Sequence, residues 1–283
     1  MKVCIDFHYS DFWADPKKQF VPKAWEGMDI EEKSDALYNF TLESLTQLLD
    51  AGVDVGMVQI GNEINNGMSG ETDVANIRKL LTAGSKAVRE AAANSGKEIL
   101  VAIHYTNIDD MKKLDTLLTG LQVKEIDYDI VGLSFYPYWH GTMDDLKNAI
   151  THIRNTYGKK VYVAENAYCY TAEDGDGSAN SVEGTDDLAE GYSAAYRDRP
   201  MKCGMSVRQP AKPELRGYST GKVPGSRSVP QMLTIPTFGK NTAAAGPAAM
   251  HPVMIRRMPV NTTADVPGTI RQCLTSPGIP LLL

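Results

Sequence analysis

Apolar and polar positions follow two different rhythms along residues 1–195. Short apolar runs of strand length occur at Val3–Phe7, Val55–Ile60, Ile99–Ile103, Ile130–Phe135 and Lys160–Ala164. Longer segments with apolar residues at helical spacing separate them, at Glu31–Leu49, Val74–Ala93, Met111–Leu121 and Asp144–Tyr157. Continuous apolar runs are typical of strands buried on both faces of a parallel sheet. The alternation predicts an α/β fold with right-handed crossovers, and both a doubly wound sheet and a barrel remain open on this pattern.

Residues 196–283 show neither rhythm. The body, 1–195, holds 32 of the 35 acidic residues, whereas the tail holds 12 of the 15 prolines. The tail has 12 Lys and Arg and three Asp and Glu, which gives a net charge of +9. The body has 17 Lys and Arg and 32 Asp and Glu, which gives a net charge of −15. A disordered linker or extension is one reading of such a composition. We therefore divide the chain into a folded body, 1–195, and a largely irregular, disordered or poorly packed tail, 196–283.

Charge and composition exclude several classes of protein. The net charge of −6 and the lack of a long basic run argue against a nucleic-acid partner, which clustered Lys and Arg would have to neutralise. No apolar stretch reaches the roughly 18 residues of a membrane span, and the first residues do not form a signal peptide. Four scattered cysteines predict neither a disulfide framework nor a zinc site. A neutral polymer such as a polysaccharide fits this chain better.

Reactive side chains in parallel α/β folds gather at the carboxyl ends of strands. The residues that follow the predicted strands are polar or aromatic: His8–Asp11, Gly61–Glu63, His104–Tyr105, Tyr136–Trp139 and Glu165–Asn166. Glu63 and Glu165 stand three strand-helix units apart, and in a barrel such strand ends face one another across the mouth. A lone glutamate there is more often a helix cap or an ion-pair partner. Two of them together, with aromatic residues between, indicate the paired carboxylates of a glycosidase.

Four longer segments carry a specific resemblance. They are IDFHYSDFWADPKKQ from Ile5, VQIGNE from Val58, YDIVGLSFYPYWHGTMDDLK from Tyr128 and VYVAENAYCYT from Val161. Together they resemble the signatures of glycoside hydrolase family 53, the arabinogalactan endo-β-1,4-galactanases, over nearly all of residues 2–195. The resemblance implies a (β/α)8 TIM barrel of which this chain supplies strands three to seven, so that the fourth strand ends at Glu63 and the seventh at Glu165.

The resemblance also implies an activity and a set of roles. It implies a retaining, endo-acting hydrolase of β-1,4-galactan or arabinogalactan, secreted like its relatives, that needs no cofactor for its chemistry. Glu63 would be the acid/base and Glu165 the nucleophile. Asn62 would contact the sugar and Tyr136 would orient the nucleophile. The other expected substrate contacts are His8, Asp11, Trp13, Trp139 and His104, although His104 begins a segment, HYTN, that departs from the usual HLDNG.

Two other readings of the site stay open at this point. The paired glutamates are shared by barrel glycosidases that act on other β-1,4-glycans. A carbohydrate-binding relic that lacks turnover would keep the same residues. Separately, the loop DGDGSAN offers Asp174, Asp176 and Asn180 as oxygen ligands at alternate positions, with glycines that permit tight turning. Bacterial members of the family use this loop for calcium, so the resemblance implies a structural Ca²⁺ site there.

The chain departs from the family at both ends. Relatives have two strand-helix units before the IDFHYSD strand, so Met1 reads as an internal methionine. After Ala195 the resemblance stops, but a shifted reading frame of the tail permits family-like strings such as SGQANEVRDV and GIQYWEGAWIPVGP. We therefore expect residues 196–283 to be a frameshifted translation. We also expect the chain as written, with open edges on its first and last strands, to be impaired or inactive.

The nucleotide sequence that encodes the tail tests this expectation directly. A frameshift predicts that a single insertion or deletion near codon 195 restores the family's eighth strand through to the end of the gene. Sequencing the locus in both directions is the measurement. One tail codon that is incompatible with the shifted strings would contradict it.

Overall fold

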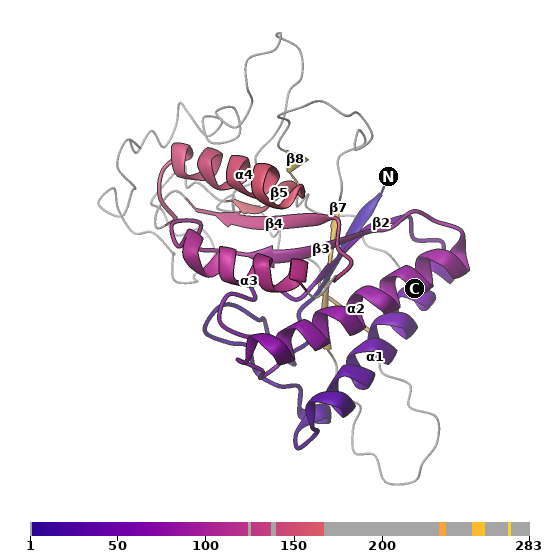
Figure 1. The fold of residues 1–283 in the computed structure, drawn as a ribbon. Helices are drawn as coiled ribbons and strands as arrows, with labels where there is room; N and C mark the ends of the chain where they lie inside the picture. Colours follow the sequence, from indigo (N-terminus) through magenta and orange to yellow (C-terminus); the bar gives the residue numbers. More distant parts are fainter. Residues whose placement is uncertain are drawn as a thin grey trace, which may run out of the picture.

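Five parallel strands form the centre of one sheet (Figure 1). They are β1 (Val3–Phe7), β2 (Val55–Ile60), β3 (Leu100–Tyr105), β4 (Ile130–Phe135) and β5 (Lys160–Asn166). Each strand pairs in parallel with the next one along the chain. The computed structural model describes residues 2–123, 126–136 and 140–166 and, beyond these, three short strands of the tail. The strands predicted from the apolar runs are confirmed.

Four helices alternate with these strands, as the sequence pattern predicts. They are α1 (Ile30–Asp50), α2 (Val74–Ser95), α3 (Met111–Val123) and α4 (Met143–Tyr157), and a short 3-10 helix, η1 (Lys23–Trp25), precedes α1. Helices α1 and α2 run side by side (Figure 1). Within the described residues no helix is both long and apolar enough to cross a membrane. The alternation of β1–β5 with α1–α4 makes the described part of the body a partial (β/α)8 barrel that corresponds to strands three to seven.

Local sequence signals set the ends of the helices. Asp29 caps the start of α1 through its side chain, and Thr142 does so for α4 in a capping box with Asp145. These side chains accept hydrogen bonds from backbone N–H groups that have no partner within the helix. Helices α2 and α4 end at Gly96 and Gly158, both of which have a left-handed backbone that glycine adopts without strain.

Three tail strands extend the sheet at its two edges. They are β6 (Met232–Ile235), β7 (His251–Arg257) and β8 (Arg271–Gln272), and the strand order is β6-β7-β1-β2-β3-β4-β5-β8. Strand β7 pairs antiparallel with β1, and β8 pairs in parallel with β5. We expected the edges of β1 and β5 to be open, but both are paired. The physical reason is that an unpaired row of backbone N–H and C=O groups readily accepts another strand. An antiparallel neighbour of β1 differs from the all-parallel arrangement of a complete barrel.

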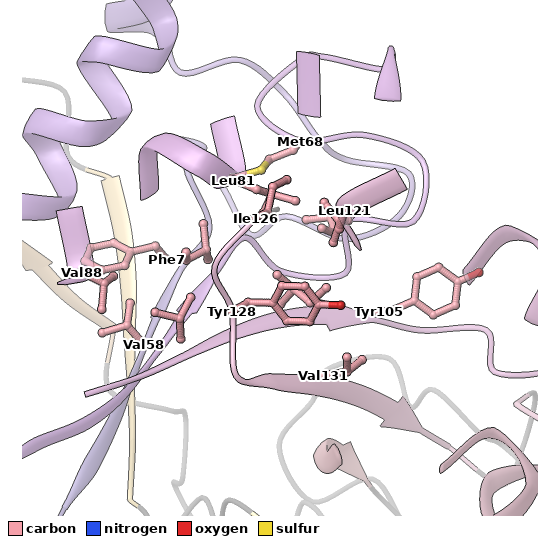
Figure 2. Close-up of a cluster of buried hydrophobic side chains, with 14 of the residues drawn as sticks. Phe7, Val58, Met68, Leu81, Val88, Tyr105, Leu121, Ile126, Tyr128 and Val131 are labelled. Carbon is pink, nitrogen blue, oxygen red and sulfur yellow. The ribbon is translucent and has the colours of Figure 1, made fainter. Parts of the chain in front are cut away.

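The two faces of the central sheet carry different side chains. The face toward the helices carries the main apolar cluster, and Figure 2 shows part of it, with Phe7 and Val58 of the strands and Leu81 and Val88 of α2. The opposite face begins with a smaller apolar layer at the amino ends of the strands, formed by Cys4, Met57, Ala102, Ile130, Tyr162 and Ala164. Polar residues follow toward the carboxyl ends. The apolar packing therefore holds the sheet rigid and leaves one end of its inner face for chemistry.

Gly84 lets α2 approach the sheet closely. A Cβ atom at this position would lie 2.7 Å from Ile60 Cγ2 and 3.3 Å from Leu37 Cδ2. Gly120 differs, because its Cβ would meet only the mobile end of the Arg78 side chain, at 2.8 Å from Nη1. The two glycines lie inside helices, so the propensity gain from alanine is similar at both and only the packing differs.

We predict that Gly84→Ala lowers the free energy of unfolding by about 1 to 2 kcal/mol, because overpacking outweighs the helix-propensity gain. Gly120→Ala is the matched control and should leave the free energy unchanged or raise it by up to about 1 kcal/mol. Urea unfolding followed by circular dichroism measures both. Equal effects of the two substitutions would mean that close packing at Gly84 does not limit stability.

Candidate active site

Buried polar side chains occupy the inner face of the sheet at the carboxyl ends of the strands. Asp6 of β1, Gln59 of β2, His104 of β3 and Ser134 of β4 are all fully buried. Glu63 and Glu165 lie just beyond, in the turn after β2 and near the end of β5. A buried polar group is costly unless it is hydrogen-bonded, so these side chains must satisfy one another.

A strained turn presents Glu63. The chain leaves β2 through Gly61, which has φ +80°, and Glu63 itself has φ +47°. A Cβ atom on Gly61 would lie 2.6 Å from Ile64 Cγ2, so only glycine fits there. A glutamate in the left-handed region is costly and is kept only where the surroundings impose it, most often at functional positions. The result is a largely buried Glu63 carboxyl whose Oε1 lies 2.7 Å from Ser134 Oγ.

A β-bulge aims Glu165 into the same place. The register between β4 and β5 shifts after Leu133. Leu133 pairs with Val163, but the next residue, Ser134, pairs with Glu165, so that Ala164 is left out of the pairing. Bulges re-aim side chains and are common beside active sites. The Tyr136 hydroxyl, from the residue that follows β4, donates a 2.7 Å hydrogen bond to Glu165 Oε2. Ser134 is thus the hydrogen-bond partner of the Glu63 carboxyl and the strand neighbour of Glu165.

The two carboxyl groups differ in their electrostatic surroundings. Burial, followed by the negative charge of Glu165, raises the pKa of Glu63 from 4.5 to about 7. Asp15 adds a smaller increase, and hydrogen bonds from the hydroxyls of Ser134 and Thr106 work in the opposite direction. Glu63 is therefore neutral at mildly acidic pH. A carboxyl that stays protonated beside a second carboxyl is what an acid/base and nucleophile pair requires.

A chain of hydrogen bonds supports Glu63 from below. His104 Nε2 lies 2.9 Å from Ser134 Oγ, and His104 Nδ1 lies 2.9 Å from Asn62 Oδ1 and 3.1 Å from Gln59 Nε2. Gln59 in turn donates to Asp6 Oδ1 at 2.6 Å.

The side-chain oxygen of Gln59, Oε1, is held by a residue of β5 on the same face of the sheet. It accepts a 2.5 Å hydrogen bond from the Tyr162 hydroxyl, whose ring passes over Gly132. A Cβ atom at Gly132 would come within 2.8 to 3.0 Å of that ring, so glycine makes room for it. Together these contacts link all five parallel strands beneath the carboxyl pair.

A second histidine lies on the outer side of Glu63. His140 Nε2 lies 3.1 Å from Thr106 Oγ1, and the backbone N–H of Tyr136 donates to His140 Nδ1 at 3.2 Å. Burial lowers the pKa of His140, which favours the neutral ring. His140 therefore connects Thr106, which bonds Glu63, with the backbone of Tyr136, whose hydroxyl bonds Glu165.

The remaining predicted contact residues lie in different surroundings. Asn62 is buried and donates through Nδ2 to the Ala14 carbonyl at 2.8 Å. His8 is 2% exposed, its Nδ1 accepts from the Ala14 N–H, and its ring packs edge-on against Trp13. Asp11 Oδ2 accepts from the Lys23 N–H at 2.7 Å.

Exposure separates two further predicted residues. Trp13 is 43% exposed, whereas His104 is fully buried, with both ring nitrogens close to protein atoms. Trp139 and the predicted calcium ligands Asp174, Asp176 and Asn180 lie outside the described residues. Their roles stay predictions.

Gln59, Ser134, Thr106 and His140 are parts of this site that the sequence reasoning did not single out. Gln59 and Ser134 carried a usable signal, because each is a polar residue inside an otherwise apolar strand, and such a residue needs buried partners. Thr106 and His140 stand among the polar residues that follow strands. Nothing in their spacing distinguishes them from loop residues.

Paired carboxyl groups at the carboxyl ends of parallel strands define the class of barrel glycoside hydrolases. The sequence agrees with this class, because residues 1–200 match the model of glycosyl hydrolase family 53. The chain belongs to this family.

Curated relatives and solved structures give the same picture. An endo-beta-1,4-galactanase of Bacillus subtilis is 50% identical over 182 residues, covering 64% of this chain and 42% of that protein. An arabinogalactan endo-beta-1,4-galactanase of Cellvibrio japonicus is 38% identical over 193 residues, covering 64% and 50%. The GH53 catalytic domain of Ignisphaera aggregans superposes with a TM-score of 0.58 at 38% identity, covering 65% and 51%. The chain thus spans about half the length of the curated relatives it matches.

The raised pKa of Glu63 makes stability depend on pH. In the unfolded chain this carboxyl ionises near its ordinary pKa of 4.5, whereas in the folded chain it ionises near 7. The contribution of Glu63 to stability is therefore fully present below about pH 4.5 and is lost as pH rises through about 7. A neutral amide at this position avoids the loss.

We predict that Glu63→Gln raises the free energy of unfolding at pH 8 by up to about 3 kcal/mol and has a much smaller effect at pH 4. Chemical unfolding at a series of pH values measures the difference. Glu43→Gln, at an exposed position of α1, is the matched control for loss of one carboxylate. Parallel pH curves for Glu63→Gln and the unsubstituted chain would contradict the raised pKa.

Proposed function

We propose that this chain carries the catalytic centre of a retaining, endo-acting hydrolase of β-1,4-galactan or arabinogalactan. The observation that carries the proposal is the unequal carboxyl pair. Glu63 is buried and held protonated, and Glu165 is partly exposed and accepts a hydrogen bond from Tyr136. Two carboxyl groups of opposite protonation state are the minimum machinery for hydrolysis with retention of configuration.

The chemistry follows from the position of the proton. Glu63 donates its proton to the glycosidic oxygen while the Glu165 carboxylate attacks the anomeric carbon, so the leaving sugar departs with a hydroxyl and a glycosyl ester forms on Glu165. Glu63, now ionised, takes a proton from water, and that water displaces Glu165 from the anomeric carbon. Two inversions give net retention. The Tyr136 hydrogen bond orients Glu165 for attack and weakens as the carboxylate becomes an ester.

Relatives and surface residues favour galactan as the substrate. The similar proteins of Bacillus subtilis and Cellvibrio japonicus bear the names of galactan-cleaving enzymes. In the segment that follows β1, Phe12, Trp13 and Phe20 expose large apolar side chains, with Phe12 at 68%. Exposed aromatic rings suit the apolar faces of sugars. A cell-wall polysaccharide cannot enter a cell as a polymer, so we place the action of this enzyme outside the cell.

The proposed reaction uses side chains of the chain alone. Structural Ca²⁺ at Asp174, Asp176 and Asn180 belongs to the same proposal but takes no part in a chemical step. The division at residue 195, with a frameshifted tail beyond it, is likewise proposed. Because both edges of the five-strand segment pair with tail strands, activity of this chain reports on whether those pairings can replace the missing strands.

We predict that the chain releases galacto-oligosaccharides from potato galactan at a low rate and that Glu165→Ala lowers this rate at least about 100-fold, because the glycosyl ester cannot form. Chromatography of the products after long incubation measures both. Glu43→Gln should keep the rate of the unsubstituted chain. Release from mannan, cellulose or xylan instead of galactan would replace the substrate, and binding of galactan without any product would favour a carbohydrate-binding relic.

Azide distinguishes the two glutamates by stereochemistry, with an aryl β-1,4-galactobioside as substrate. In Glu165→Ala, azide enters the space left by the nucleophile and yields the α-galactobiosyl azide. In Glu63→Ala, the activated leaving group departs without an acid, and azide attacks the glycosyl ester to yield the β-azide. The same anomer from both variants would contradict the assigned roles.

A further inference from the structure

The buried residues beneath Glu63 can satisfy its carboxyl in either protonation state. We propose that Ser134 and His104 form a reversible hydrogen-bond relay, in which the Ser134 hydroxyl and the two ring nitrogens of His104 exchange donor and acceptor roles when Glu63 loses or gains its proton. Both are positioning residues. The relay rests on the proposed function for its role, because the proposed reaction uses Glu63 first as an acid and then as a base. The hydrogen bonds themselves do not depend on that function.

With Glu63 neutral, the hydrogen bonds run away from it. The Glu63 carboxyl donates to Ser134 Oγ, across 2.7 Å, and the Ser134 hydroxyl donates to His104 Nε2, across 2.9 Å. His104 then carries its proton on Nδ1 and donates to Asn62 Oδ1, at 2.9 Å. Asn62 presents oxygen there because its Nδ2 is committed to the Ala14 carbonyl.

With Glu63 ionised, the two bonds that join Glu63, Ser134 and His104 reverse, and the bond at His104 Nδ1 changes partner. The Ser134 hydroxyl donates to the Glu63 carboxylate, and His104 carries its proton on Nε2 and donates to Ser134 Oγ. His104 Nδ1 becomes an acceptor, and Gln59 Nε2 stands 3.1 Å away to donate to it. The orientation of the Gln59 amide is set independently. Its side-chain Oε1 accepts a hydrogen bond from the Tyr162 hydroxyl, and the other N–H of Nε2 donates to Asp6.

The unusual feature is therefore the double set of partners at His104 Nδ1. A fixed acceptor, Asn62 Oδ1, and a fixed donor, Gln59 Nε2, both lie within hydrogen-bond distance of one nitrogen. A histidine with a single structural role needs only one of them. Since each tautomer of the ring has a partner on this side, His104 Nδ1 keeps a hydrogen bond in both states of Glu63. The Glu63 backbone N–H, 3.4 Å away, is a second donor to this nitrogen when it carries no proton.

Proton balance in the relay is simple. When Glu63 loses its proton to water, His104 gives up its Nδ1 proton to water and takes one at Nε2. The net change is one proton lost by the protein. The ring stays neutral in both states. The charged groups that act on Glu63 are Glu165 on β5 and Asp15 after β1. His140, after β4, contacts Thr106, which bonds Glu63, and Asp6 of β1 reaches His104 through Gln59.

The experiment is a pH titration of the full chain by NMR without substrate. Side-chain ¹³C signals of glutamate report the ionisation of Glu63, assigned by their loss in Glu63→Gln, and ¹⁵N signals of labelled histidine report which nitrogen of His104 carries the proton. We expect the His104 tautomer to change from Nδ1–H to Nε2–H with the same midpoint as Glu63. In Glu63→Gln this change should disappear.

Ser134→Ala should separate the two events. Glu63 then loses the hydroxyl that stabilises its ionised form, so its midpoint should rise by about one pH unit, and His104 should stop following it. Ser85→Ala removes another buried hydroxyl, which contacts the Asp127 carbonyl far from the carboxyl pair, and should leave both titrations unchanged.

A constant His104 tautomer throughout the Glu63 titration of the unsubstituted chain would overturn the relay, and so would a tautomer change that persists in Glu63→Gln. The unsubstituted chain alone decides this if Ser134→Ala does not fold. The titration needs no turnover, so the outcome for the relay and the outcome of the galactan-cleavage test are obtained independently of one another.

Discussion

The buried polar layer on the inner face of the sheet has to be hydrogen-bonded in full, and the rest of the site depends on this requirement. Each polar residue of the layer comes from a different strand, so its partners exist only when the strands are in register. Asp6, Gln59, His104 and Ser134 therefore connect the correct assembly of the sheet to the placement of Glu63. An error in register would leave several of them unsatisfied at once.

Two local distortions of the backbone complete the arrangement. The left-handed turn at Gly61 and Glu63, after β2, and the bulge before Glu165, in β5, bring the two carboxyl groups close enough for the charge of Glu165 to act on Glu63. Both are energetically unfavourable by themselves and persist because the apolar packing between sheet and helices is extensive. The helix-facing core thus stabilises an inner face that contains strain, buried charge and few apolar contacts.

The same polar layer explains how one pair of carboxyl groups supports two different ionisation states. Burial and the charge of Glu165 favour the neutral form of Glu63, whereas the hydroxyls of Ser134 and Thr106 favour its ionised form. The balance places the pKa of Glu63 near neutrality, where both forms are accessible. Without the hydroxyls the carboxyl would be too weak an acid to give up its proton readily.

The sequence by itself determined the order of strands and helices and the family, because these depend on neighbouring residues and on long contiguous motifs. It also selected Glu63 and Glu165, which directly follow or end apolar strands. Only the tertiary structure decided that Ser134 contacts Glu63, that His104 faces two alternative partners, and that tail strands pair with β1 and β5. Those relations join residues far apart in the chain through register, bulges and burial, none of which is encoded in any single segment.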